Sequence, residues 1–304
     1  MSAATLMRGF SVHVAEIRGI RTEYWLGGEG PPVVLVHGLG GAAVNFTELA
    51  PLLARRHRVL VPDLPGHGGT APLARVAGVG DLAEHVGAVA ERERMLPGTV
   101  LGYSMGGLVA LRLAVDRPAA VRGLALVAPA GIVSTTKRAR AWVRIVGVLR
   151  PARAVSRFRH SIARRRTLRR LAFGYWGAAD PGALSSEAVL GFLEGPPRHT
   201  DVESAGWALV GDDPRQDLDR LECPTVLVWG ARDRLVPLED GFEYARRLRC
   251  PIRMVGGAGH LLLAEEPAAC AELLGTFLDR VREVDELPLD AELLGQLGRQ
   301  GTDA

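Results

Sequence analysis

The stretch LGYSMGG, residues 101–107, decides how the rest of the chain is interpreted. It holds the pattern G-x-S-x-G, formed by Gly102, Ser104 and Gly106, directly after an apolar run and directly before a segment of helical period. A sharp turn from strand to helix strains its central residue, and flanking glycines leave room because they have no side chain. This context predicts that Ser104 is presented at the carboxyl edge of a sheet, beside a helix N-terminus whose dipole favours developing negative charge.

Short apolar runs of the kind that form strands buried on both faces of a sheet recur along the chain. They are residues 32–38, 58–63, 99–104, 121–129, 224–230 and 251–257. Segments of helical period, which begin at Asp81, Met105 and Glu239, separate several of them. Two alternating segments, 11–17 and 20–26, predict an antiparallel hairpin before the first run. The order predicts an α/β fold with a mostly parallel sheet and helices on both faces.

The interval between the runs that end near Pro129 and begin at Pro224 has helical patches but no convincing strand. We therefore predict that residues 131–212 form a helical insertion on top of the sheet. Residues 1–130 and 213–281 then form the core, and the charged segment 282–304 is predicted to be a loosely docked helix or tail. The insertion holds seven of the chain's sixteen aromatic residues: Trp142, Phe158, Phe173, Tyr175, Trp176, Phe192 and Trp207.

Two loops downstream of the serine carry the residues that it needs to react, because a serine hydroxyl is a weak nucleophile without a base held by a third group. Asp233 lies just past one predicted strand, in WGARDRLVP, and His260 lies just past the next, in GGAGH. Since parallel strands end at the same edge, we predict that Ser104, Asp233 and His260 meet there as nucleophile, acid and base. Glu239 and Asp240 are weaker candidates for the acid, because they lie in the following predicted helix.

The glycine-rich loop VHGLGG, residues 36–41, supplies a candidate oxyanion hole. The chain leaves a predicted strand at His37, and the backbone N–H groups that follow are able to point at a substrate oxygen. We predict that the amides of Leu39 and of Met105, the residue after the nucleophile, are the two donors. His37 itself is assigned a structural role.

Together these motifs resemble the α/β-hydrolase-fold family. VHGLGG, VPDLPGHGGT, GYSMGG, WGARDRLVP and GAGH stand in the family's order over about residues 20–280. The resemblance implies an eight-stranded sheet, a helical cap at 131–212 after the sixth strand, and Ser104, Asp233 and His260 in the three catalytic roles. It also implies that His67, in the DLPGHG loop, belongs to a structural turn.

Acyl transfer is the reaction that this set of residues predicts, and it requires neither a metal nor another cofactor. We expect a carboxylic ester with an apolar acyl or aryl group, because ligand pockets are mostly apolar and the predicted cap is rich in aromatic residues. The serine argues against dehalogenase and epoxide-hydrolase chemistry, because enzymes of those two kinds that resemble this chain use an aspartate at the position of Ser104.

Three alternatives remain open. The first is a carbon–carbon bond hydrolase of aromatic ring-cleavage products. In its favour, Asn45 stands about where such enzymes have an asparagine, and cap arginines could hold a dienoate carboxylate. Against it, Leu261 stands where they commonly carry tryptophan. The second is a cofactor-free haloperoxidase or perhydrolase, which uses the same site. The third is a binding protein without catalytic activity.

The basic residues are concentrated in one part of the chain. Thirteen lie between Lys137 and Arg170 with no acidic residue among them, so the total of +3 leaves −10 for the rest. No zinc-finger spacing, RNP motif or heptad-linked basic region accompanies them, so we predict no nucleic-acid partner. The basic amphipathic segment 139–150 could rest on an anionic membrane. The alternative is that the run is only the solvated surface of an arginine-rich cap.

No apolar run reaches the roughly 18 residues of a membrane-spanning helix, and the first residues lack the apolar core of a signal peptide. A cytoplasmic location is therefore the default expectation. Cys223, Cys250 and Cys270 are too widely spaced for a metal site or a disulfide framework. We interpret them as small apolar residues.

Overall fold

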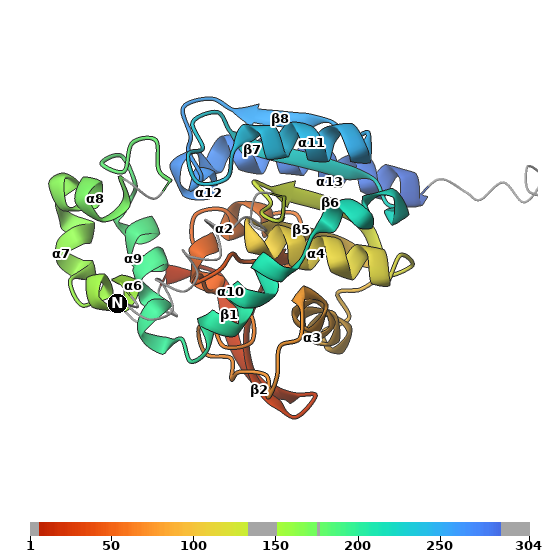
Figure 1. Ribbon diagram of the computed structural model, residues 1–304, viewed down its shortest axis with the longest axis horizontal. Coiled ribbons are helices and arrows are strands. Elements are labelled where there is room, and N and C mark those ends of the chain that lie inside the picture. The colour runs from red at the N-terminus through yellow and green to blue at the C-terminus, as the bar shows by residue number, and fades with distance from the viewer. Residues whose placement is uncertain (1–5, 133–150, 175–176, 287–304) are drawn as a thin grey trace, which may run out of the picture.

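The computed structural model describes residues 6–132, 151–174 and 177–286 (Figure 1). Their centre is one eight-stranded sheet in the order β1-β2-β4-β3-β5-β6-β7-β8. The strands are β1 Phe10–Ile17, β2 Ile20–Gly27, β3 Pro32–Val36, β4 Arg58–Pro62, β5 Gly98–Tyr103, β6 Val121–Val127, β7 Thr225–Gly230 and β8 Ile252–Val255. Strand β2 pairs antiparallel with β1 and β4, and all other neighbours are parallel. The predicted mixed, mostly parallel sheet is confirmed.

The first two strands form the predicted hairpin. Ile17 pairs with Ile20, and the two residues between them, Arg18 and Gly19, both have positive φ, at 54° and 75°. Positive φ at both central residues is the geometry of a type I′ turn, whose twist matches that of the flanking strands. Every one of the six apolar runs corresponds to one strand of the sheet.

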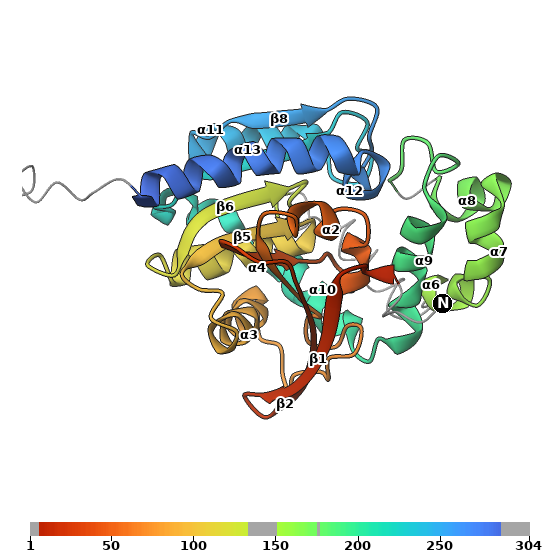
Figure 2. The ribbon, with the colours of Figure 1, turned by 180° about the vertical axis from the view of Figure 1, so that it is seen from behind.

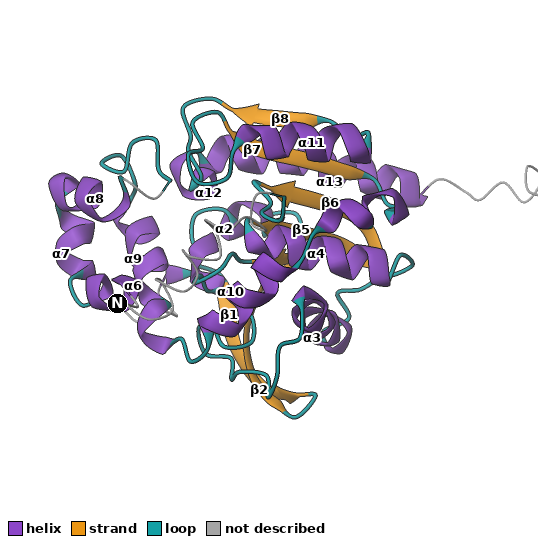
Figure 3. Ribbon diagram, viewed as in Figure 1, coloured by secondary structure: helices purple, strands orange, loops and turns teal. Residues whose placement is uncertain are grey.

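Helices cover both faces of the sheet, as predicted (Figure 3). Figure 1 shows α3 (Val79–Arg92), α4 (Met105–Asp116) and α11 (Leu238–Leu248) on one face. Figure 2 shows α13 (Pro267–Glu286) on the other, where α2 (Ala50–Leu53) also packs.

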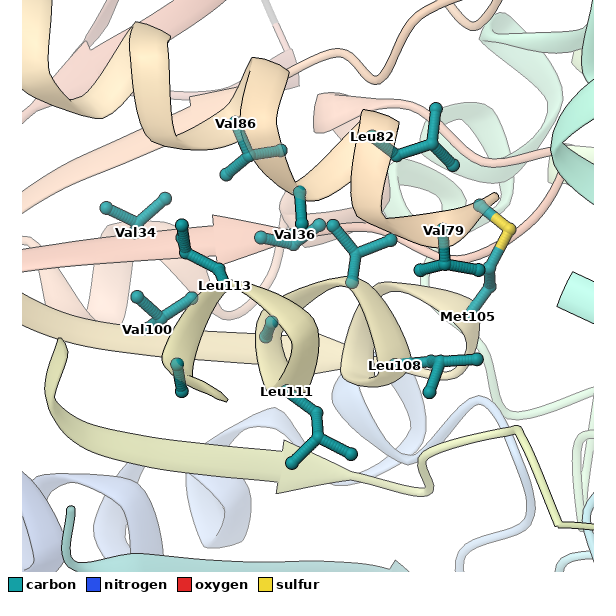
Figure 4. Packing of buried hydrophobic residues seen from close by; sticks show 14 of the residues in the cluster. Val34, Val36, Val79, Leu82, Val86, Val100, Met105, Leu108, Leu111 and Leu113 are labelled. Atoms are coloured by element: carbon teal, nitrogen blue, oxygen red, sulfur yellow. The ribbon is translucent and has the colours of Figure 1, made fainter. Parts of the chain in front are cut away.

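Alternation along the strands builds an apolar core on each face, because successive side chains point to opposite sides. Val34 and Val36 of β3 and Val100 of β5 pack beneath Val86 of α3 and Leu113 of α4 (Figure 4). The side chains next to them in sequence point to the other face and belong to the second core, with α2 and α13. These residues are Val33, Leu35 and Leu101.

The interval between β6 and β7 is a helical insertion, as predicted. Its helices are α6 Pro151–Ser156, α7 Arg159–Arg164, α8 Arg166–Phe173, α9 Ser186–Glu194 and α10 Val202–Gly211, with short 3₁₀ turns η3 Pro196–Arg198, η4 Pro214–Gln216 and η5 Leu218–Arg220. Helices α6 to α9 lie beyond one end of the sheet (Figures 1 and 2). They have an apolar cluster of their own, which includes Ile162, Phe173, Leu184, Val189 and Leu193.

Helix α10 differs from the other helices of the insertion. Its residues Ala205, Ala208 and Leu209 pack with the core beneath α3 and α4. The predicted cap extends through residue 212, and α10, its last helix, shares its apolar contacts with the sheet layer.

After β8 the chain continues through α12 to α13. The short helix α12 spans Leu262–Glu265 and leads into α13. We predicted no helix between β8 and residue 282. Residues 287–304, which include most of the predicted tail, and the amphipathic segment 139–150 lie outside the described residues.

Burial agrees with the interpretation of the cysteines as apolar residues. Cys270 is fully buried, Cys223 and Cys250 are half-buried, and all three are free thiols. In the described part of the chain, no helix combines the length and the apolar character that a membrane crossing requires.

Candidate active site

Ser104 lies on the turn that joins β5 to α4, where it adopts φ 55° and ψ −122°. A residue with a side chain rarely adopts a positive φ, so this turn is strained, as the sequence predicts. The flanking glycines are required by close approach. A Cβ on Gly102 would lie 2.2 Å from the carbonyl oxygen of Gly106, and a Cβ on Gly106 would lie 2.2 Å from that of Val36. The turn therefore presents the half-buried Ser104 hydroxyl at the carboxyl edge of the sheet.

The structure brings the three predicted site residues together. His260 Nε2 lies 3.0 Å from Ser104 Oγ, and His260 Nδ1 lies 2.8 Å from Asp233 Oδ2. Asp233 Oδ1 accepts the backbone N–H groups of Leu235 and Val236, at 2.8 and 3.0 Å. The side chains of His260 and Asp233 are 4% and 0% exposed. A buried carboxylate that accepts Nδ1–H leaves Nε2 as the acceptor for the serine proton, which is the arrangement that general-base catalysis needs.

The two predicted oxyanion donors flank the serine. Leu39 follows Gly38, where a Cβ would lie 3.0 Å from Ser104 Cβ, and Met105 is the first residue of α4. Neither amide donates to an acceptor within residues 6–132, 151–174 and 177–286. Backbone N–H groups at half-buried or buried positions are normally paired, so two free donors beside a nucleophile are available to a substrate oxygen.

The loop that carries His260 is held by contacts that our sequence analysis missed. The His260 N–H donates to the carbonyl of Gly177 in the insertion, and its own carbonyl accepts the Tyr103 hydroxyl at 3.0 Å. Glu265 Oε2 accepts the Gly259 N–H at 2.8 Å, and its other oxygen accepts the Ala179 N–H. The insertion therefore contacts the backbone of the candidate base directly. No pattern in the sequence marked Gly177 or Glu265 as a partner of this loop.

Burial raises the pKa of Glu265, and the backbone N–H groups that it accepts from Gly259, Ala179 and Asp180 oppose that increase. Hydrogen bonds to both carboxyl oxygens join the histidine loop to residues 179–180. Glu265 thus links the histidine loop to the insertion.

His199 of the insertion supports the oxyanion loop. Its Nε2 donates to the Gly40 carbonyl at 2.9 Å, and its Nδ1 accepts the Gly68 N–H at 2.9 Å. Burial lowers the pKa of His199 to about 3, so the ring is neutral and able both to donate and to accept. His199 follows the short turn η3, and no pattern in the sequence around it predicted this contact.

The other two histidines near the loop have structural contacts. His37 is buried, its Nε2 accepts the Leu64 N–H at 3.0 Å, and its Nδ1 donates to the Gly38 carbonyl at 2.9 Å. His67 Nδ1 donates to the Pro65 carbonyl at 3.0 Å within the predicted turn. Burial lowers the pKa of both rings to about 3, so they remain neutral.

Asn45 is also engaged by backbone groups. Its Oδ1 accepts the Ala42 N–H at 3.0 Å, and its Nδ2 donates to the Gly191 carbonyl of α9 at 3.2 Å.

Among the described residues, no group of three or more histidine, cysteine or acidic side chains is placed to hold a metal ion.

Replacing Gly177 with alanine should lower kcat/KM for an ester about 10- to 100-fold, since small displacements of a catalytic group carry such losses. Gly177 has φ 139°, and a Cβ there would lie 2.7 Å from His260 Cβ. The insertion or the histidine must move, and the distance from Nε2 to Ser104 Oγ changes with it. Steady-state kinetics would measure the loss.

Gly275→Ala is the matched control. Gly275 lies in α13 with nothing within 4 Å of an added Cβ. Alanine is favoured over glycine in a helix, so we expect unchanged activity and slightly greater stability. Unchanged kinetics in Gly177→Ala would show that the contact does not position His260.

Comparisons with known proteins agree with this fold. The pattern described as "Alpha/beta hydrolase family" matches residues 33–273, which include Leu39, Ser104, Asp233 and His260. The pimeloyl-[acyl-carrier protein] methyl ester esterase of Chromobacterium violaceum is 34% identical over 226 residues, which cover 73% of this chain and 83% of that protein.

Two further matches are more limited in what they show. The magnesium-chelatase 30 kDa subunit of Rhodobacter capsulatus is 42% identical over 91 residues, but the match covers only 30% of this chain and 32% of that protein. The crystal structure of a putative lipase from Acinetobacter baumannii AYE has a TM-score of 0.76 at 21% identity, over 93% of this chain and 97% of that one. Such identity shows the fold alone. With the family pattern spanning most of the sheet and its loops, the chain belongs to the alpha/beta hydrolase family.

Proposed function

We propose that the protein is a serine hydrolase that cleaves carboxylic esters with an apolar acyl or aryl group through an acyl-enzyme intermediate. The observation that carries the proposal is the hydrogen-bonded series from Asp233 through His260 to Ser104, with distances of 2.8 and 3.0 Å. In this series the serine has its base, and the base has the group that orients it.

The first half of the reaction forms the acyl-enzyme. His260 Nε2 takes the hydroxyl proton as Ser104 Oγ attacks the ester carbonyl carbon, and the carbonyl oxygen becomes an oxyanion. The Leu39 and Met105 amides donate to that oxygen, and each such donor stabilises the transition state by about 3 kcal/mol. Asp233 keeps the ring oriented and stabilises the imidazolium. The protonated Nε2 then gives its proton to the departing alkoxide oxygen as the C–O bond breaks.

The second half returns the enzyme to its starting state. His260 removes a proton from water, the resulting hydroxide attacks the acyl carbon, and the same two amides stabilise the second oxyanion. When the bond to Oγ breaks, Ser104 recovers a proton from His260 and the carboxylic acid leaves. These residues alone balance every proton in the cycle.

The environment of His260 supports an apolar acyl or aryl group. Leu261, the next residue, and Phe192 of α9 pack against the apolar cluster of the insertion. The apolar cluster of the insertion therefore extends to the residue that follows the candidate base, and apolar side chains are what most ligand pockets are lined with. The methyl ester esterase similarity supports an ester as the bond that is cleaved.

Among the described residues, the side chains that suggested carbon–carbon cleavage have other contacts or are exposed. Asn45, which suggested that reaction, uses both of its side-chain polar atoms on backbone groups. Arg169 donates to the backbone carbonyls of Ala163 and Leu184, and Arg164 and Arg166 are exposed on helices α7 and α8. We therefore rank this reaction, like perhydrolysis by the same site, below ester hydrolysis.

A panel of p-nitrophenyl esters with acyl chains of increasing length, run beside a dienoate ring-cleavage product, tests the proposal. We expect kcat/KM to rise about fourfold per methylene until the pocket is filled, because each buried CH₂ is worth roughly 0.8 kcal/mol. The dienoate should react at least about 100-fold more slowly than the preferred ester. Preference for the dienoate, or a kcat/KM that does not change with acyl length, would overturn the proposed substrate class.

A further inference from the structure

Helices α6 to α8 carry charge of one sign. Residues 151–173 contain eight arginines and no acidic residue. Arg159 pairs with Glu194 at 3.1 Å, Arg170 pairs with Asp180 at 3.7 Å, and Arg169 donates to backbone carbonyls. The other five arginines are exposed and form no ion pair with any residue that the structure describes. They are Arg153, Arg157, Arg164, Arg165 and Arg166.

Two large apolar side chains in the same segment are also exposed to solvent. Leu171 is 80% exposed and Phe158 is 66% exposed, the two highest values among the exposed large hydrophobic residues of the described chain. On α8, Arg166 and Arg170 are four positions apart and so lie on one side of the helix, and the exposed Leu171 directly follows Arg170. We call the five arginines together with Phe158 and Leu171 the basic surface.

We propose that the basic surface binds an anionic lipid membrane. Interfacial helices combine apolar side chains that enter the acyl boundary with arginines that attract anionic headgroups. The guanidinium group suits a lipid phosphate in particular, since it donates two parallel hydrogen bonds. Leu171 has no such use in a nucleic-acid complex, where a base stacks on an aromatic ring and an exposed leucine gains nothing.

The placement of these helices fits contact with a flat surface. Figures 1 and 2 show α7 and α8 at the outer end of the molecule, on the side of the insertion that faces away from the sheet. Neither the sheet nor α13 stands between them and a membrane. Docking there would place the insertion, which contacts the His260 loop through Gly177, next to lipid. Substrate esters dissolved in the membrane would then be within reach of the site.

Vesicle flotation tests the proposal. The Ser104→Ala variant is used so that lipid hydrolysis cannot change the vesicles. We expect the protein to float with phosphatidylcholine vesicles that contain about 30% phosphatidylglycerol, with a partition coefficient at least about 30-fold above that for phosphatidylcholine alone. Raising the salt from about 50 to about 150 mM should weaken binding several-fold, because salt screens the arginines. Absence of binding at the lower salt, or equal binding to both vesicles, would overturn it.

Matched variants test whether binding depends on the basic surface itself or only on the net charge of the protein. Replacing Arg164, Arg165 and Arg166 with glutamine should lower the partition coefficient about 100-fold, at roughly fivefold for each arginine near the membrane. The control replaces three exposed arginines elsewhere with glutamine, for the same change in charge, and should stay within about twofold of the parent. These control positions are Arg55, Arg75 and Arg253. Equal losses in the two triple variants would contradict a defined surface.

The apolar part of the basic surface has its own test. Phe158→Ser with Leu171→Ser should weaken flotation about 10-fold or more, because two apolar side chains no longer enter the membrane. Val14→Ser with Phe242→Ser is the control, since these residues are 52% and 55% exposed outside the insertion. In the background that retains Ser104, all these variants should hydrolyse a soluble short-chain ester normally, which shows that they fold. Binding of single-stranded RNA by the parent without binding of anionic vesicles would replace the membrane with a nucleic acid and overturn the proposal.

Discussion

Replacing Ser104 with alanine should lower kcat/KM for the preferred ester by roughly 10⁵-fold or more, the scale of loss for the nucleophile in serine hydrolases. The alanine removes the only oxygen that lies within hydrogen-bond distance of His260 Nε2, at 3.0 Å, among the described residues. No acyl-enzyme forms without it. Residual turnover would come only from the Leu39 and Met105 amides acting on bound substrate. Initial rates with the purified variant, measured over a wide range of enzyme concentration, would establish the factor.

A serine outside the site serves as the control for that experiment. Ser11→Ala, on the exposed strand β1, should leave the kinetics unchanged. Full activity of Ser104→Ala would remove the serine mechanism. Absence of turnover by the unmodified protein across the ester panel would instead favour a binding protein without catalytic activity.

Replacing Asp233 with asparagine should lower kcat about 10⁴-fold at neutral pH, as loss of the orienting carboxylate does in serine hydrolases. The carboxylate accepts Nδ1–H of His260 and two backbone N–H groups, from Leu235 and Val236. An asparagine keeps an acceptor for the backbone, but it can present an NH₂ group to Nδ1. The imidazole then carries its hydrogen on Nε2 and cannot accept the proton of Ser104.

Glu239→Gln controls for the loss of a nearby carboxylate. Glu239 lies in the first turn of α11 and is exposed, so we expect activity within about twofold of the unmodified protein, as for most surface substitutions. The comparison is made by steady-state kinetics on both variants at one pH. A loss in Asp233→Asn that is no greater than the loss in Glu239→Gln would assign the acid to another residue.

The sequence predicts the sheet and the meeting of Ser104, Asp233 and His260 because these features have local causes. A strand buried on both faces must be a continuous apolar run, so all six runs marked strands. A nucleophile on a strained turn needs small neighbours, and Gly102 and Gly106 revealed that turn. Parallel strands end at one edge, which placed the three side chains together without any contact information.

The contacts around the site could not be predicted in the same way. Gly177, His199 and Glu265 act across long sequence separations, through bonds from the insertion to backbone groups of the core or the reverse. Backbone N–H and carbonyl groups are present at nearly every residue, so a bond to one of them leaves no complementary residue in the sequence, and neither partner reveals the other. The packing of α10 on the core was missed for a related reason, because its small apolar residues suit either layer.

Labelling with a fluorophosphonate tests the central claim most directly, because this reagent traps a serine that its base has activated. We predict one adduct per chain, located by peptide mapping at Ser104 Oγ, absent from Ser104→Ala and formed much more slowly in Asp233→Asn. An unlabelled Ser104 in a protein that still hydrolyses its ester, or an adduct at a different residue that abolishes activity, would contradict it.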